Sequence, residues 1–383
     1  MHQATRAVHA GMDALQSEPT PLSPPIYQSS VFLFDDLQRA GDVTGGLAPG
    51  YSYARIGHPN ADMFSAAVAE LEGAPAAATA ASGMAAILAA LLAARGEGSI
   101  AIAEEIYGGS VAIARSFLSP LGVACTFFDA HDPEAIPDGA GAVLVETCSN
   151  PLGSLTDVAA LAQAAHRKGA RLVVDNTFAT PYLIRPLSLG VDLVVHSATK
   201  FLSGHGDVIL GVLAGSRELV AAAQSLLTTF GATPDPFAAW LGLRGLRTFG
   251  VRMEHAVQNA AAIARMLEAH PKVRRVHHAS LQSHPQREIA ERFFDGRGPA
   301  ILAFDLESEQ AAEQFVARLR WIRYAPSLGD VATILLHPAT TSHRQLSPEE
   351  QARLGITPGT VRLSVGIEAE EDLVEELSHG LAG

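Results

Sequence analysis

The sequence predicts an α/β fold in which a large domain with a mostly parallel sheet is followed by a smaller α+β domain. First, the chain has 383 residues, 48% of them hydrophobic, which is enough for a large buried core. Second, short strand-like runs alternate with helical stretches through residues 61–250, as is typical of a parallel sheet covered by helices on both faces. Third, the order of elements changes after residue 250, which indicates a second domain over 251–383.

Residues 1–60 precede the alternating pattern and form the first predicted segment. They are rich in Pro, Gly, Ser and Tyr and show no sustained hydrophobic period. We therefore expect an extended N-terminal arm that cannot fold alone and packs on something else.

The length and composition of each apolar run assign the elements of the two domains. Strands of the large domain are expected over 76–81, 99–103, 124–128, 142–146, 171–175, 191–196 and 208–214. Its helices include 84–94, 109–119 and 156–168, the last with Thr156 as its N-cap. The smaller domain is expected to contain a helix over 251–270, strands over 273–277, 300–306, 333–336 and 361–365, and a C-terminal helix.

Charge and cysteine content narrow the class of protein. A formal net charge of -13 disfavours nucleic acid and anionic membranes as partners. Two cysteines are too few for a disulfide framework, which fits a reducing cytoplasm. The uncharged stretch 74–94 is mostly alanine and is interrupted by Ser82-Gly83, so we expect a buried strand and helix there and no membrane span.

Lys200 is the candidate nucleophilic amine among only three lysines. Lys168 lies at a basic helix end and Lys272 in a basic turn, where an ordinary solvated lysine is expected. Lys200 instead follows an apolar strand, with Ser and Thr before it and glycines after it. Partial desolvation there would lower its pKa and favour a Schiff base with a carbonyl, although the segment alone is also compatible with a surface loop.

Other chemically distinctive residues follow the ends of predicted strands, where open α/β sheets build their sites. Ser82-Gly83-Met84 opens a helix whose amides could hold a phosphate, and Tyr107 opens another and offers a ring for stacking. Asn150 follows the fourth strand. Asp175 ends the fifth strand, where its carboxylate could pair with a protonated pyridine nitrogen, a ribose hydroxyl or Mg²⁺. The sequence contains neither a G-x-G-x-x-G nor a P-loop motif to support a nucleotide.

Histidines could suggest a metal site, but their spacing does not. His196, His205 and the pair His277-His278 do not occur with carboxylates at the spacing of metal ligands. We expect structural histidines and no metal.

Ordered motifs along nearly the whole chain resemble one enzyme family. They are Thr5-Arg6-Ala7-Val8-His9-Ala10-Gly11, Tyr53-Ala54-Arg55-Ile56-Gly57-His58-Pro59-Asn60, Ser82-Gly83-Met84, Tyr107-Gly108, Glu146-Thr147-Cys148-Ser149-Asn150-Pro151, Asp175-Asn176-Thr177-Phe178, Ser197-Ala198-Thr199-Lys200 and Arg362-Leu363-Ser364-Val365-Gly366-Ile367-Glu368. The chain resembles the trans-sulfuration enzymes of cysteine and methionine metabolism, which have the type I fold of pyridoxal-phosphate enzymes. The resemblance implies pyridoxal 5'-phosphate as the cofactor and an amino acid as the substrate.

The resemblance also implies roles for individual residues. Lys200 would form the Schiff base with the cofactor and move protons, and Asp175 would pair with the pyridinium nitrogen. Tyr107 would stack on the ring and assist loss of the leaving group. The phosphate would be held by Ser82, Gly83, Met84, Ser197 and Thr199. Arg362 would bind the substrate α-carboxylate, and Ser327 would lie near the cofactor lysine and the substrate. Asn150 would lie near the hydroxyl of the cofactor ring and near the substrate. Tyr53 and Arg55 would reach the cofactor phosphate of a neighbouring subunit in a homotetramer built from dimers.

The reaction implied by the resemblance is β- or γ-elimination, or replacement at Cγ, and the subfamily markers disagree. Methionine γ-lyases usually have a cysteine at the position of Gly109, and cystathionine-processing members usually have a glutamate where this chain reads Asp330-Val331-Ala332. Gly204-His205-Gly206-Asp207 resembles the lyases, whereas residues 337–343 resemble O-acylhomoserine sulfhydrylases. We expect a carbon–sulfur lyase of the cystathionine γ-lyase or methionine γ-lyase type. The alternatives are a sulfhydrylase or cystathionine γ-synthase, a non-catalytic α/β binding protein and a nucleotide-dependent enzyme.

Overall fold

The computed structural model describes residues 2–11 and 21–382, and the larger of its two sheets has seven strands. In chain order they are β1 (Ala76–Ala80), β2 (Ser99–Ala103), β3 (Cys125–Phe128), β4 (Ala140–Glu146), β5 (Arg171–Asp175), β6 (Leu193–Ser197) and β7 (Gly211–Gly215). Across the sheet they lie in the order β1-β7-β6-β5-β4-β2-β3, and only β7 runs against its neighbours. The carboxyl ends of the other strands therefore meet at one edge. This confirms the prediction of a mostly parallel sheet.

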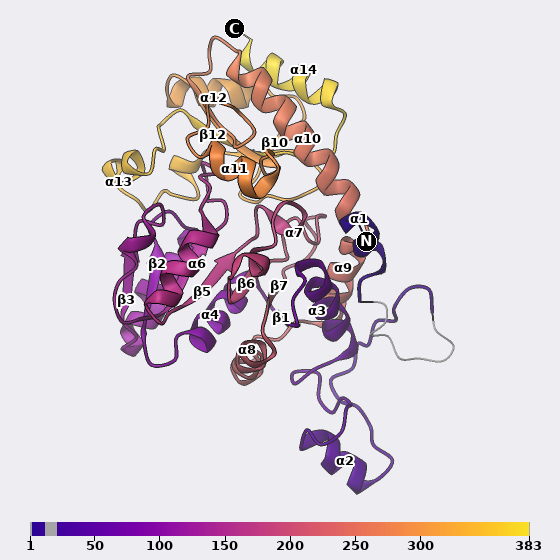
Figure 1. Ribbon diagram of the computed structural model, residues 1–383. Helices are drawn as coiled ribbons and strands as arrows, with labels where there is room; N and C mark the ends of the chain where they lie inside the picture. The colour runs from indigo at the N-terminus through magenta and orange to yellow at the C-terminus, as the bar shows by residue number, and fades with distance from the viewer. Residues whose placement is uncertain (1, 12–20, 383) are drawn as a thin grey trace.

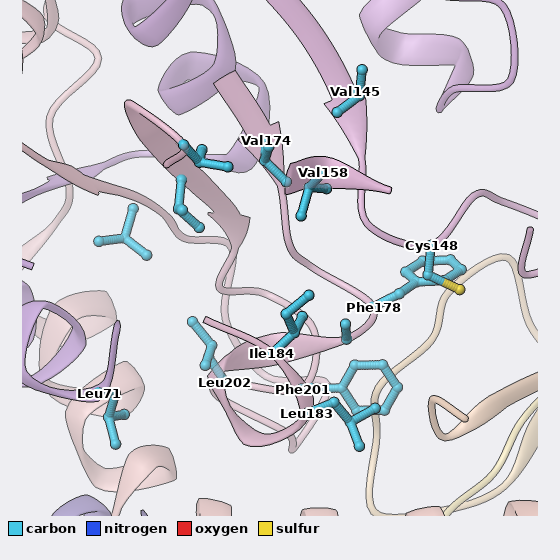
Figure 2. Packing of buried hydrophobic residues seen from close by; sticks show 14 of the residues in the cluster. Leu71, Val145, Cys148, Val158, Val174, Phe178, Leu183, Ile184, Phe201 and Leu202 are labelled. Atoms are coloured by element: carbon cyan, nitrogen blue, oxygen red, sulfur yellow. The ribbon is translucent and has the colours of Figure 1, made fainter. Parts of the chain in front are cut away.

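Helices cover both faces of this sheet (Figure 1). One face carries α4 (Gly83–Ala94) and α8 (Arg217–Phe230), and the other carries α3 (Pro59–Glu72), α6 (Val158–Arg167) and α9 (Pro236–Leu246). Alternate strand residues feed the two cores, as the pleat requires, so Ile100 and Ile102 face one and Ala101 and Ala103 the other. Figure 2 shows part of the core beneath α3, α6 and α9. In this core Val145 and Val174 lie on the neighbouring strands β4 and β5, and Val158 begins α6.

A second, smaller sheet follows in the C-terminal part of the chain. Its strands are β8 (Arg275–His277), β9 (Ile301–Asp305), β10 (Arg323–Tyr324), β11 (Ile334–Leu336) and β12 (Thr360–Ser364), in the order β10-β11-β12-β9-β8. Helices α10 (Phe249–Glu268), α12 (Glu309–Arg318) and α14 (Glu370–Leu381) share a core with it. Phe249 and Met253 of α10 belong to the core of the large sheet, whereas Ile263 and Leu267 belong to the smaller one. Because α10 crosses both cores, the domain boundary at residue 250 stays a prediction.

The arm contains two short helices that its sequence did not predict. Helix α1 (Gln3–His9) packs against α10 and α3, and α2 (Leu37–Thr44) buries none of its residues. Figure 1 shows α2 projecting from the rest of the chain. The other short α-helices are α5 (Gly108–Ala112), α7 (Thr180–Leu183), α11 (Arg287–Phe294) and α13 (Pro348–Arg353). In the described part of the chain, no helix has both the length and the hydropathy needed to cross a membrane.

Some predicted boundaries were wrong for local reasons. The strand expected over 208–214 begins only at Gly211, because Leu210 exchanges hydrogen bonds with Thr199 after β6. The helix expected over 109–119 is α5 followed by a π-helical turn over Ile113–Leu118. Thr156 is not the N-cap of α6; the Asp157 side chain accepts the hydrogen bond from Ala160 N at 2.9 Å instead.

Candidate active site

A cavity of about 700 Å³ lies at the carboxyl edge of the large sheet and is closed by loops of the smaller one. Eleven of the predicted site residues line it. They are Ser82, Gly83, Met84, Tyr107, Asn150, Asp175, Ser197, Thr199, Lys200, Ser327 and Arg362. These residues come from positions far apart in the sequence, so the fold brings together what the sequence only suggested.

Lys200 lies in the turn after β6 and points to the smaller sheet. Its Nζ donates a hydrogen bond to Ser327 Oγ at 3.1 Å. Burial, and secondarily the charge of Arg362, lowers the pKa of this amine. Gly329 packs against the lysine backbone at φ +79°, where an added Cβ would lie 2.8 Å from Lys200 C. The turn is therefore fixed by close backbone contact.

Asp175 ends β5 as a buried carboxyl group with one oxygen in use. Its Oδ1 accepts hydrogen bonds from the main-chain N and the hydroxyl of Thr177. Among the described residues, none donates a hydrogen bond to Oδ2. Burial raises the pKa of Asp175, although both Thr177 bonds and nearby His196 oppose this effect. A cationic N–H donor in the cavity would complete its environment.

The start of α4 and the segment after β6 form a narrow cradle. The Ser82 side chain caps α4 by accepting from Ala85 N at 3.2 Å. A Cβ on Gly83 would lie 2.8 Å from Ser197 Cβ, so only glycine allows this approach. The first amides of a helix lack partners within the helix and favour anions. With the Thr199 and Ser197 hydroxyls nearby, the cradle suits a phosphate group.

Arg362 of β12 is buried and lacks an acidic partner in the described chain. Its Nη1 donates to Asn150 Oδ1 and its Nη2 to Ser327 O, both at 2.8 Å. Its Nε is buried without a hydrogen-bond partner among the described residues. Burial lowers its pKa to about 10. A carboxylate ligand would therefore compensate a guanidinium that is otherwise held only by neutral oxygens.

Tyr107 also lines the cavity, at the start of α5, and is half exposed. A Cβ on Gly109 would lie 2.4 Å from Tyr107 Cε1 and 2.7 Å from Met84 Sδ. The cysteine common in methionine γ-lyases would therefore displace this ring, so glycine at position 109 fixes where the ring can lie.

Tyr53 and Arg55 do not lie in this cavity. Arg55 Nη1 donates to Thr228 O at 2.9 Å, and its guanidinium lies 5.5 Å from the centre of the Tyr53 ring. Within one chain the structure thus separates the pair from Lys200.

The histidines considered as metal ligands bond elsewhere. His196 contacts Glu72 at 2.7 Å, and His205 Nδ1 contacts Ser203 O at 2.6 Å. His277 contacts Asp305 at 2.8 Å, and His278 contacts Pro299 O at 2.9 Å. Among residues 2–11 and 21–382, no group of three or more His, Cys, Asp or Glu side chains could hold a metal ion.

Sequence reasoning missed Glu146, Thr177 and Arg344, which also line the cavity. Glu146 ends β4 as Asp175 ends β5, and the two face each other in the strand register. The signal used for Asp175, an acid ending an apolar strand, would have found Glu146 as well.

Comparison with known proteins identifies the family. The family model of the Cys/Met metabolism PLP-dependent enzymes matches residues 4–382. The chain belongs to this family. It is therefore a pyridoxal-phosphate-dependent enzyme of trans-sulfuration, as the motifs predicted, and a non-catalytic or nucleotide-dependent protein is not supported.

Curated relatives in the family have different activities. The chain is 40% identical to an L-methionine γ-lyase of Porphyromonas gingivalis, over 99% of this chain and 96% of that one. It is 39% identical to an O-succinylhomoserine sulfhydrylase of Pseudomonas aeruginosa, over 93% and 90%, and 37% identical to a cystathionine γ-lyase of Bacillus subtilis, over 100% and 99%. These identities are too similar to separate the activities.

Solved structures show the same fold. A Campylobacter jejuni chain assigned as an O-acetylhomoserine (thiol)-lyase, which carries a pyridoxyl-lysine phosphate, has a TM-score of 0.93 and 29% identity, covering 100% of both chains. A cystathionine γ-synthase of Xanthomonas oryzae has a TM-score of 0.91 and 38% identity, covering 100% of this chain and 98% of that one. The predicted fold class and cofactor are confirmed.

Proposed function

We propose that this enzyme is a carbon–sulfur lyase that binds an amino-acid substrate through Arg362 and moves its Cα proton with the Lys200 amine. The observation that carries the proposal is that both groups meet at Ser327. Lys200 Nζ donates to its hydroxyl at 3.1 Å, and Arg362 Nη2 donates to its carbonyl at 2.8 Å. A substrate held by its carboxylate at Arg362 has its Cα next to the amine.

The cavity residues fit the cofactor in three places. Asp175 Oδ2 is available to a protonated ring nitrogen, the cradle at Gly83 and Ser197 suits the phosphate, and Tyr107 offers a ring for stacking. When bound, pyridoxal phosphate supplies an electron-withdrawing ring that makes the Cα proton of the substrate acidic. Met84, Ser82 and Thr199 complete the phosphate site in this proposal.

Lys200 is suited to proton transfer because its pKa is lowered by burial and by Arg362. A neutral amine can take the Cα proton and return it to a neighbouring carbon. Asn150 orients Arg362 through their 2.8 Å hydrogen bond. In this proposal the hydroxyl of Tyr107, which also lines the cavity, assists departure of the leaving group.

A second candidate, γ-replacement on an O-acylhomoserine, is favoured by the charges in the cavity. Its lining contains two guanidinium groups, those of Arg344 and Arg362, beside the Lys200 amine. Its carboxyl groups, Glu146 and Asp175, both lie at strand ends. The described cavity lining offers no further carboxylate for the distal ammonium of cystathionine, and this favours a neutral or anionic distal group.

Asp330 takes no part in this lining. Its Oδ1 accepts from Ala332 N at 2.9 Å, and its Oδ2 lies 2.5 Å from where a Cβ on Gly206 would be. It is therefore engaged beside the lysine turn and does not substitute for the glutamate of cystathionine-processing relatives.

We also propose that the enzyme is a cytoplasmic homotetramer in which Tyr53 and Arg55 serve the cofactor phosphate of the partner subunit. Large apolar side chains of the arm are exposed in a single chain, among them Leu33 at 95% and Leu37 at 92%. Apolar side chains so exposed favour burial against another subunit.

Borohydride reduction tests the anchor role of Lys200. It is expected to fix pyridoxal phosphate to the peptide that contains Lys200, and Lys200→Ala should bind the cofactor without a stable covalent link. Label on Lys168 or Lys272 would contradict the proposal.

A product assay tests the reaction. Methionine, cystathionine, O-acetylhomoserine and O-succinylhomoserine are compared with and without sulfide. Release of a 2-oxo acid from a sulfur amino acid without sulfide supports the lyase, whereas homocysteine formation that strictly requires sulfide supports γ-replacement. Arg344→Gln provides a second measure: if Arg344 contacts an anionic acyl group, the preference for O-succinylhomoserine over O-acetylhomoserine should fall about tenfold.

A further inference from the structure

Glu146 is a buried side chain of the cavity to which the proposed reaction gives no role. It ends β4 with 7% of its surface exposed, and Asp175 lies opposite it in the register of β4 and β5. Burial, and then the charge of Asp175, raises the pKa of Glu146 well above its usual range. A carboxyl group there is costly unless strong donors satisfy it.

Its donors are main-chain amides of two different loops. Glu146 Oε1 accepts from Tyr107 N at 2.9 Å, in the loop between β2 and α5. Its Oε2 accepts from Asn150 N at 3.3 Å, in the loop that follows β4. Each oxygen thus holds one loop.

These two loops carry different groups of the cavity lining. Tyr107 carries the half-exposed ring, and Asn150 Oδ1 accepts from Arg362 Nη1 at 2.8 Å. A single carboxyl group therefore connects the loop that carries the Tyr107 ring with the loop that holds the Arg362 guanidinium.

We infer that Glu146 is a positioning residue that holds the Tyr107 ring and the Asn150–Arg362 pair at a fixed separation across the cavity. The inference rests on the proposed roles of Tyr107 and Arg362. It implies that one substitution should weaken cofactor binding and substrate binding together, because the two groups share one support.

Glu146→Gln tests this inference with little change of volume. Glutamine keeps one carbonyl oxygen but presents an NH₂ group to the other amide, so one of the two loops loses its acceptor. We expect the dissociation constant of pyridoxal phosphate, titrated by absorbance into the apoprotein, to rise about tenfold. The KM of the best substrate should rise by a similar factor, with a smaller change in kcat.

Glu376→Gln is the matched control. Glu376 is also buried, and its Oε1 accepts from two main-chain amides, Arg320 N and Trp321 N, while its Oε2 accepts from Arg320 Nε at 2.8 Å. It lies in α14, away from the cavity. Glu376→Gln should lower the thermal stability, as Glu146→Gln does. It should leave the dissociation constant of pyridoxal phosphate and the KM at their wild-type values.

The possible outcomes distinguish a failure of the inferred role of Glu146 from a failure of the proposed enzyme function. If Glu146→Gln lowers only stability and changes neither constant, Glu146 is structural and the inference is wrong. If that variant does not fold, Glu146→Asp decides, because its shorter carboxylate cannot reach both amides; wild-type constants in Glu146→Asp overturn the inference. A wild-type enzyme without activity on any assayed amino acid refutes the proposed function instead, and cofactor titration still reports on Glu146.

Discussion

The surroundings of His278 disfavour the charged form of its imidazole. His278 is buried, contacts Pro299 O at 2.9 Å through Nε2, and contacts Ser280 Oγ at 2.7 Å through Nδ1. Since a carbonyl can only accept, Nε2 carries the proton and Nδ1 accepts from the serine hydroxyl. Burial lowers the pKa of His278 from 6.5 to about 4.

This lowered pKa predicts a loss of stability in mild acid. As the pH falls below 6.5, His278 takes up a proton in the unfolded chain, but in the folded chain it does so only near pH 4. The free energy of unfolding is therefore highest above pH 6.5 and decreases as the pH falls from 6.5 to about 4. The contribution is at most about 1.4 kcal/mol per pH unit. Urea unfolding at pH 7 and pH 5 should show a smaller difference in His278→Gln than in the wild type. An unchanged difference in His278→Gln would refute the prediction.

Single residues were predicted from the sequence when their own type and place were informative. Lys200 was found because lysine is scarce and this one follows an apolar strand, and Asp175 because a buried acid requires a partner. Glu146 was missed because its importance depends on contacts with residues 107 and 150, which only the folded chain brings to it.

The loop 327–330 matters at the scale of elements because it packs directly on the lysine turn. Gly329 adopts φ +79°, and a Cβ there would lie 2.6 Å from Phe201 N. Arg252 supports the same turn from α10 by donating to Phe201 O at 2.8 Å and Leu202 O at 3.1 Å. The position of the Lys200 amine therefore depends on elements of both sheets.

Gly329→Ala is expected to disturb cofactor binding as well as stability. Gly231→Ala is the matched control, since Gly231 has φ +71° but an added Cβ would meet open space. The control should cost only the backbone strain, about 1 kcal/mol. Gly329→Ala should unfold at a lower temperature than the control and lose affinity for pyridoxal phosphate in absorbance titrations. Wild-type affinity in Gly329→Ala would show that the loop does not fix the lysine.

The existence of the main strands and helices was predictable because each apolar run has a characteristic length. The order of strands was not. Strand β7 inserts between β1 and β6 in the opposite direction, and a Cβ on Gly211 would lie 2.1 Å from Ser82 O. Such a contact between segments far apart in the chain produces no periodic pattern in the local sequence, so the strand order could not be predicted from it.

In the proposed oligomer, the N-terminal arm of one subunit completes the active site of its partner. Arg55 lies outside the cavity of its own chain, held by Thr228 O. In the proposed dimer, each site combines Lys200 of one subunit with Arg55 of the partner subunit.

Subunit mixing tests this arrangement. Lys200→Ala and Arg55→Ala enzymes should each be nearly inactive, and co-expression should restore about a quarter of wild-type specific activity, because mixed dimers contain one intact site. Arg39→Ala changes an arm residue outside the Tyr53–Arg55 pair and serves as the control. This variant should keep wild-type specific activity by itself. Absence of restored activity in verified mixed dimers would mean that Arg55 serves its own subunit or no site at all.

The scarcity of lysine has a consequence for stoichiometry. Lys168 Nζ is bound to Ile136 O at 2.5 Å and Asp138 at 3.2 Å, and Lys272 Nζ to Leu381 O at 2.7 Å. An aldehyde added to the folded protein therefore meets few competing side-chain amines. Apoprotein titrated with pyridoxal phosphate should reach a sharp end point near one equivalent per chain, so the chain can serve as a quantitative standard for its own cofactor.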